Sequence, residues 1–175
     1  MDNSKITRRN PENMPKPVGN YSHITKIPRN AELYVTSGQI GVDLSGKLPE
    51  SFNQQLINTF ANIRKVLASE QLTAGDIIKV NIWATEKIDW EFMYSEWSKL
   101  FGGEYPAMTV GYITELGWPE IKIEIEIWAA KVYHEDLFLW RQKKKARLSG
   151  YPFSLAFGFL LSSILFIKLL SQAAQ

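Results

Sequence analysis

Cysteine is absent from this sequence of 175 residues, and histidine occurs only twice. Without a thiol, the chain forms no disulfide, no cysteine nucleophile and no cysteine-ligated zinc or iron–sulfur site. The histidines, His23 and His134, stand at opposite ends of the predicted domain, and neither belongs to an H-E-x-x-H zinc motif. No G-x-S-x-G motif supplies a nucleophilic serine either. The common hydrolase motifs therefore assign no function to this sequence.

A strong excess of positive charge is also missing, because the formal net charge is only +2. The chain as a whole is therefore not a polycation suited to nucleic acid. Its basic residues instead gather in one short stretch, formed by Arg141, Lys143, Lys144, Lys145 and Arg147. The N-terminal stretch is polar and contains no apolar run, so we expect a disordered lead-in over residues 1–12 rather than a signal peptide.

The spacing of apolar residues predicts two helices, over residues 52–67 and 90–100. Asp89 is expected to cap the second helix, and Gly102 is expected to end it. Alternating or continuous apolar runs predict strands over residues 21–27, 33–40, 77–84, 108–113 and 121–132. This order predicts an α+β domain over residues 13–133, with a mixed sheet, both helices on one face and a partner subunit on the other.

The loop over residues 41–48 nearly spells a phosphate-binding motif between a strand and a helix. Two of its residues argue against nucleotide binding. Leu48 replaces the hydroxyl that would hold magnesium, and Asp43 places negative charge where a phosphate would lie. We therefore interpret the loop as a glycine-rich turn that leads into a helix.

Glu124 and Glu126 project from the same face of the last predicted strand. On a lone domain, this face would be solvated and the two carboxylates would have no further role. In a cleft between subunits, one of them could orient water or accept a proton. The pattern alone leaves both interpretations open, and it leaves Tyr21, Gly38 and Gln39 equally ambiguous.

Several stretches taken together resemble the Rid family of imine and enamine deaminases, also called RidA or YjgF-like proteins. The matching stretches are residues 19–22, 35–40, 60–67, 78–82, 101–102, 106–107 and 123–127. They follow the family's order over about residues 17–132. The Ser-Gly-Gln-Ile and Ile-Glu-Ile-Glu segments are the most specific among them.

The resemblance implies a chorismate-mutase-like fold with a mixed six-stranded sheet, assembled as a homotrimer with ligand clefts between subunits. Active members hydrolyse 2-imino or 2-enamino acids to 2-keto acids and ammonia, without a metal or another cofactor. By match, Glu124 would position the water, and Tyr21, Gly38 and Gln39 would line the cleft. An arginine after a Pro-Ala pair would bind the substrate carboxylate through two hydrogen bonds.

Met108 stands where the resemblance places that arginine. Methionine carries no charge and no hydrogen-bond donor, so a substrate carboxylate would lose its partner at this ligand-binding position. We therefore expect the scaffold to handle a neutral or less anionic imine. A catalytically quiet, trimeric ligand-binding or scaffold protein is the alternative. A third function, an RNA-directed ribonuclease-like activity, is disfavoured because the domain lacks a basic stripe.

Residues 151–170 are nearly all apolar and contain one charge, Lys168. About twenty residues at ~1.5 Å each match the hydrocarbon core of a bilayer, roughly 30 Å thick. The basic stretch lies within residues 134–150, which we interpret as a hinge, and it would keep the domain on the cytoplasmic side. We therefore predict a C-terminal apolar helix that anchors a cytoplasmic domain to a membrane. A helix lying on the membrane, a core helix and a non-native extension are the alternatives.

Overall fold

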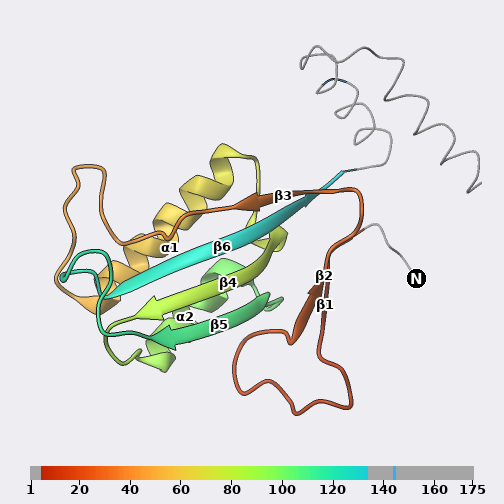
Figure 1. Cartoon of the computed structure of the whole chain (residues 1–175), viewed down its shortest axis with the longest axis horizontal. Helices are drawn as coiled ribbons and strands as arrows, with labels where there is room; N and C mark the ends of the chain where they lie inside the picture. The colour runs from red at the N-terminus through yellow and green to blue at the C-terminus, as the bar shows by residue number, and fades with distance from the viewer. Residues whose placement is uncertain (1–4, 134–143, 145–175) are drawn as a thin grey trace, which may run out of the picture. The chain divides into compact units, whose positions relative to one another are not determined.

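The centre of the fold is a mixed sheet of four strands, in the order β3-β6-β4-β5 (Figure 1). These strands are β3 (Ala31–Val35), β6 (Ile123–Val132), β4 (Ile77–Ala84) and β5 (Ala107–Tyr112). Within the sheet, β4 and β5 run parallel, and β6 is antiparallel to both of its neighbours. The expected α+β class with a mixed sheet is therefore confirmed.

The structure is a computed structural model that describes residues 5–133 and 144. Its N-terminal compact unit ends at Tyr133. The predicted anchor over residues 151–170 lies outside the described residues, and so does the predicted hinge over residues 134–150, except Lys144. Among the residues that are described, no helix combines the length and apolar character needed to cross a membrane.

Two further strands do not join the central sheet, so the prediction of one six-stranded sheet is wrong. β1 (Thr7–Arg9) and β2 (Ile24–Lys26) pair with each other in a separate antiparallel ladder. β2 occupies only part of the strand predicted over residues 21–27, because the start of that stretch bonds to the chain before β5 instead of to a ladder. The N–H of Ser22, for example, donates to the carbonyl of Pro106 at 3.0 Å.

β1 lies inside the stretch predicted to be a disordered lead-in, and Arg8 explains why it is ordered. The Arg8 guanidinium donates to the backbone carbonyls of Gly75 and Ile77, both at 2.9 Å, and forms an ion pair with Glu104 at 3.5 Å. Burial lowers the pKa of Arg8, although the Glu104 carboxylate opposes this shift. The lead-in prediction is therefore wrong for β1, because one long side chain ties a polar segment to distant carbonyls.

Both helices pack on the same face of the central sheet, as predicted (Figure 1). α1 (Phe52–Ser69) buries Leu56, Phe60, Ile63 and Leu67 of its predicted apolar stripe, and Phe52 at its start is half-buried. α2 (Trp90–Phe101) is capped by Asp89, whose carboxylate accepts hydrogen bonds at 3.1 Å from two N–H groups of the first turn. The helix ends at Gly102, which has a left-handed φ of 64°.

The opposite face of the sheet, called the outer face below, keeps large apolar side chains exposed. Leu33 and Val35 of β3 are 56% and 61% exposed, and Trp128 of β6 is 43% exposed. Val35 lies directly across from Trp128 in the β3–β6 ladder, so the three side chains form one apolar patch. A contiguous exposed patch of this kind is typical of an interaction surface.

Candidate functional site

Gly38, Gln39 and Glu124 meet at the outer face of the sheet. The N–H of Gln39 donates to the carbonyl of Ile125 at 2.8 Å, and the N–H of Ile125 donates to the carbonyl of Gln39 at 3.0 Å. This bridge holds Gly38 against the adjacent Glu124. A Cβ atom at position 38 would overlap the Glu124 carboxylate in its present place, so glycine permits this close approach.

Glu124 and Glu126 differ in what their carboxylates bind. Asn81 Nδ2 donates to Glu126, whereas Glu124 has no hydrogen-bond or ion-pair partner within residues 5–133. Lys122, two residues before Glu124 on the same face, pairs with Glu86 at 2.6 Å instead. Because Glu124 is only half-buried, its carboxylate is both accessible and uncommitted.

Tyr21 and Met108 lie elsewhere, beside the edge strand β5. Met108 pairs with Val80 in the β4–β5 ladder and packs against the core between the sheet and the helices. The residue after Tyr21 is Ser22, which donates to Pro106, two residues before Met108. These two predicted ligand-binding residues therefore share one edge of the fold.

One chain does not bring all five predicted site residues together. Glu124 of β6 projects from the outer face, Met108 of β5 projects toward the helices, and β4 separates the two strands. The predicted site residues of one chain therefore fall into two separate groups. We call them the Glu124 half-site, formed by Gly38, Gln39 and Glu124, and the Tyr21 half-site, formed by Tyr21 and Met108.

Aromatic side chains lie close to the segment that carries Tyr21. A Cβ atom at Gly19 would overlap the hydroxyl of Tyr94, so the Tyr94 ring of α2 reaches the chain just before Tyr21. The Trp90 ring lies 5.3 Å from the Tyr94 ring, centroid to centroid. Tyr21 and Tyr105 also line a surface cavity of about 640 Å³. The contact between Tyr94 and Gly19 joins distant parts of the chain, so the sequence alone could not predict it.

Several known proteins are similar to this chain over most of their length. The family model described as Endoribonuclease L-PSP matches residues 11–131. A RutC family protein of Buchnera aphidicola is 31% identical over 126 residues, which are 70% of this chain and 95% of the relative. A RutC family protein of Aquifex aeolicus is 35% identical over 121 residues, which are 67% of this chain and 93% of the relative. The chain belongs to the Rid family.

Solved structures of other proteins share the fold of this chain. YyfB of Yersinia pestis, a conserved Rid family protein, aligns with a TM-score of 0.66 and 22% identity over 73% of this chain and 99% of its own, a likeness that shows the fold alone. Escherichia coli TdcF with bound serine aligns with a TM-score of 0.52 and 25% identity over 67% of this chain and 92% of its own. The name of TdcF assigns it provisionally to the reactive intermediate deaminases. The resemblance seen in the sequence is confirmed, and the match begins at residue 11.

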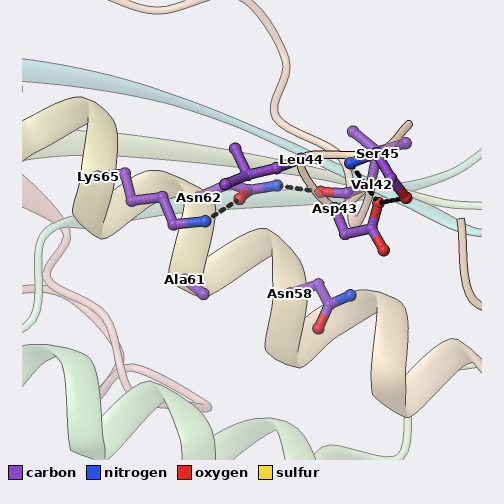
Figure 2. Close-up of a pocket in the computed structure, with 8 residues that line it drawn as sticks. All are labelled: Val42, Asp43, Leu44, Ser45, Asn58, Ala61, Asn62 and Lys65. Carbon is purple, nitrogen blue, oxygen red and sulfur yellow. Dashed lines mark hydrogen bonds between the residues drawn. The ribbon is translucent and has the colours of Figure 1, made fainter. Parts of the chain in front are cut away.

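In the glycine-rich loop over residues 41–48, the carboxylate of Asp43 binds the N–H groups of the loop itself. Asp43 Oδ1 accepts hydrogen bonds from the N–H of Ser45 at 2.8 Å and from the Ser45 hydroxyl at 2.7 Å (Figure 2). It also accepts one from the N–H of Lys47 at 3.0 Å. These bonds, above all the one from the Ser45 side chain, hold the pKa of Asp43 below its usual range. The loop therefore satisfies its N–H groups with its own carboxylate, in agreement with the interpretation against a nucleotide site.

Proposed function

We propose that this chain hydrolyses small reactive imines or enamines to a carbonyl compound and ammonia, and that Glu124 positions the water. The observation that carries this proposal is the uncommitted Glu124 carboxylate, held against Gly38 and free of the hydrogen bond that occupies Glu126. Membership of the Rid family supports the proposal, and so does the provisional name of the relative TdcF.

The proposed chemistry needs a base, a water molecule and an oriented imine. Glu124 accepts a proton from the water as the water oxygen attacks the imine carbon, and it returns this proton to the nitrogen, which gives a neutral carbinolamine. Glu124 then accepts the proton of the carbinolamine hydroxyl and passes it to the nitrogen, so that the carbon–nitrogen bond breaks and ammonia leaves as the carbonyl group forms. One water is consumed for each imine, and the step requires no oxidant or reductant.

We further propose that copies of the chain associate as a homotrimer with the cleft between them. The Glu124 half-site and the Tyr21 half-site diverge within one chain, so a second copy is the simplest source of the missing half. The exposed patch of Leu33, Val35 and Trp128 supports this assembly, because association would remove it from water. Each cleft would then combine half-sites from two chains.

Met108 favours a neutral imine as the substrate. Its side chain is half-buried against the core and offers neither charge nor donor. Trp90 and Tyr94 bring aromatic rather than cationic surface to the neighbourhood of Tyr21. A substrate carboxylate in the shared cleft would lack a partner and would face the Glu124 carboxylate of the other copy. The same features favour a catalytically quiet ligand-binding protein as the second candidate.

Glu124→Gln is expected to slow ammonia release from a freshly generated neutral imine by about 10²- to 10⁴-fold, the usual contribution of a positioned general base. Glutamine keeps the size of the side chain but does not accept the proton. Glu126→Gln is the matched control, because that side chain is already bound by Asn81 and should leave most of the activity. Equal losses of activity in the two variants would show that Glu124 has no special role in the mechanism. A wild type that releases no ammonia would contradict the proposed hydrolysis and favour the catalytically quiet ligand-binding protein.

Mixed assemblies provide the control for the shared cleft. Chains with Glu124→Gln and chains with Tyr21→Ala are refolded together in equal amounts. If each cleft takes its half-sites from two different copies, about one cleft in four has both halves intact. The mixture should then regain about a quarter of the wild-type rate by the same combination rule, whereas a mixture as slow as the single variants would contradict a shared cleft.

We also propose that residues 151–170 anchor the chain in a membrane, as their composition predicts. Alkaline carbonate extraction of membranes from cells that express the full chain should leave the protein in the pellet. A chain that ends at residue 150 is the control and should appear in the supernatant. Release of the full chain into the supernatant would rule out a spanning anchor.

A further inference from the structure

α1 holds the segment that follows the Glu124 half-site. Asn62 Nδ2 donates to the carbonyl of Ile40 at 2.9 Å and to that of Val42 at 2.8 Å, and Asn58 Nδ2 donates to the carbonyl of Gly41 at 3.0 Å. Three consecutive carbonyls are therefore held by two amides that lie one turn apart on the helix. Figure 2 shows the bond from Asn62 to Val42.

The Asn62 amide has little hydrogen-bonding capacity left for a ligand. Both of its N–H groups donate to the segment, and its Oδ1 accepts from Lys65 Nζ at 3.4 Å (Figure 2). The surface pocket beside it, about 360 Å³, is lined by the same committed amides and by the exposed Leu44. Asn62 therefore acts on the chain segment rather than on a bound molecule.

The held segment lies as close to α1 as its sequence permits. A Cβ atom at Gly41 would lie 2.5 Å from the carbonyl oxygen of Gln55 and 2.6 Å from its Cα. At its other end, the segment continues into Gln39, whose N–H and carbonyl both bond to Ile125 of β6. Fixed contacts therefore run from α1 through this segment to the strand that carries Glu124.

We infer that Asn62, supported by Asn58, is a positioning residue that sets the separation between Gly38 and Glu124. The inference rests on the proposed function for its effect on catalysis. The amides fix the carbonyls that follow Gln39. The bridge between Gln39 and Ile125 then fixes the backbone beside Gly38, which lies against the Glu124 side chain. A displacement of about 1 Å at a site of this kind is enough to lower the rate ~10²-fold.

Asn62→Asp is the variant that tests the inference. It keeps the shape of the side chain but replaces the amide NH2 group, which donates to the carbonyls of Ile40 and Val42, with a carboxylate oxygen that repels them. We expect kcat for the neutral imine to fall about tenfold to hundredfold. We also expect hydrogen exchange at the N–H groups of Gln39 and Ile125 to accelerate by about tenfold or more, because local opening of the bridge becomes easier. Both quantities are measured on the full chain.

Two controls separate positioning from general destabilisation. Asn53→Asp makes the same substitution on the same helix at a side chain with no hydrogen bond among the described residues, and it should change neither quantity. Ser51→Ala removes the cap of α1, so it should lower stability without accelerating exchange at Gln39 selectively. The inference is supported if Asn62→Asp alone turns over more slowly and alone shows faster hydrogen exchange at the N–H groups of Gln39 and Ile125. It is overturned if exchange at these two groups in Asn62→Asp matches exchange in either control. A wild type without turnover would refute the proposed function, and the exchange result would still decide the positioning role.

Discussion

Met108→Arg is expected to raise kcat/KM for 2-iminobutanoate by about a thousandfold. The arginine would supply two charge-assisted hydrogen bonds to the substrate carboxylate, and the two bonds together account for about 4 kcal/mol of transition-state stabilisation. The same variant should gain little or nothing with a neutral imine of equal size. The measurement is the ratio of kcat/KM values for the two substrates, obtained from initial rates of ammonia release.

The position of Met108 makes this exchange feasible. It lies on the edge strand β5 and is only half-buried, so the aliphatic stem of an arginine can keep the apolar contact while the guanidinium reaches solvent. Met108→Leu is the control for altered packing and should leave the substrate ratio unchanged. If the wild type already turns over 2-iminobutanoate efficiently and Glu124→Ala abolishes that turnover, the role assigned to Met108 is wrong.

Gln55→Leu is expected to lower the free energy of unfolding by about 3–5 kcal/mol, because it leaves several buried backbone groups without partners. Gln55 is fully buried on α1 and uses its whole amide. Its Nε2 donates to the carbonyls of Pro49 at 2.7 Å and Glu120 at 2.9 Å, and its Oε1 accepts from the N–H of Lys122 at 2.9 Å. Leucine fills a similar volume, so the loss is chiefly that of hydrogen bonds. Urea unfolding followed by tryptophan fluorescence measures it.

Gln54→Leu is the matched control for Gln55. Gln54 is the preceding residue, is exposed and makes one side-chain hydrogen bond, to Asn58. Its replacement should change the free energy of unfolding by no more than about 0.5–1 kcal/mol. Equal stability of the two variants would mean that the groups bound by Gln55 find other partners, and it would remove the special role given to this amide.

Gln55 also shows what the sequence could and could not predict. The spacing of Leu56 and Phe60 predicted α1 and its buried face, because a helical period repeats over many residues. The pattern gave no sign that Gln55 is buried, since its partners come from a loop before the helix and from a turn near β6. The β1–β2 ladder was missed for the same reason, because Arg8 finds its carbonyl partners around residue 76, far along the chain.

The candidate site was likewise predictable from the sequence only in part. The Rid resemblance predicted that Gly38, Gln39 and Glu124 belong together, because each stands in a specific segment, and the structure brings them together. The separation of Met108 from Glu124 was not predictable from motifs, since it depends on strand order and on which face each residue takes. The difference between the two glutamates depends on Asn81, which comes from a neighbouring strand.

The contact between Gly38 and Glu124 limits how such a site can change by single substitutions. While a glutamate occupies position 124, a side chain at position 38 would push its carboxylate out of its present place, so a substitution there also moves the candidate base. Position 108 has no such constraint, because the side chain there lies at a sheet edge and is partly solvated. A lineage that alters its substrate can therefore begin at position 108 and leave the Glu124 carboxylate in place, whereas a change at position 38 alters the cleft and the candidate base together.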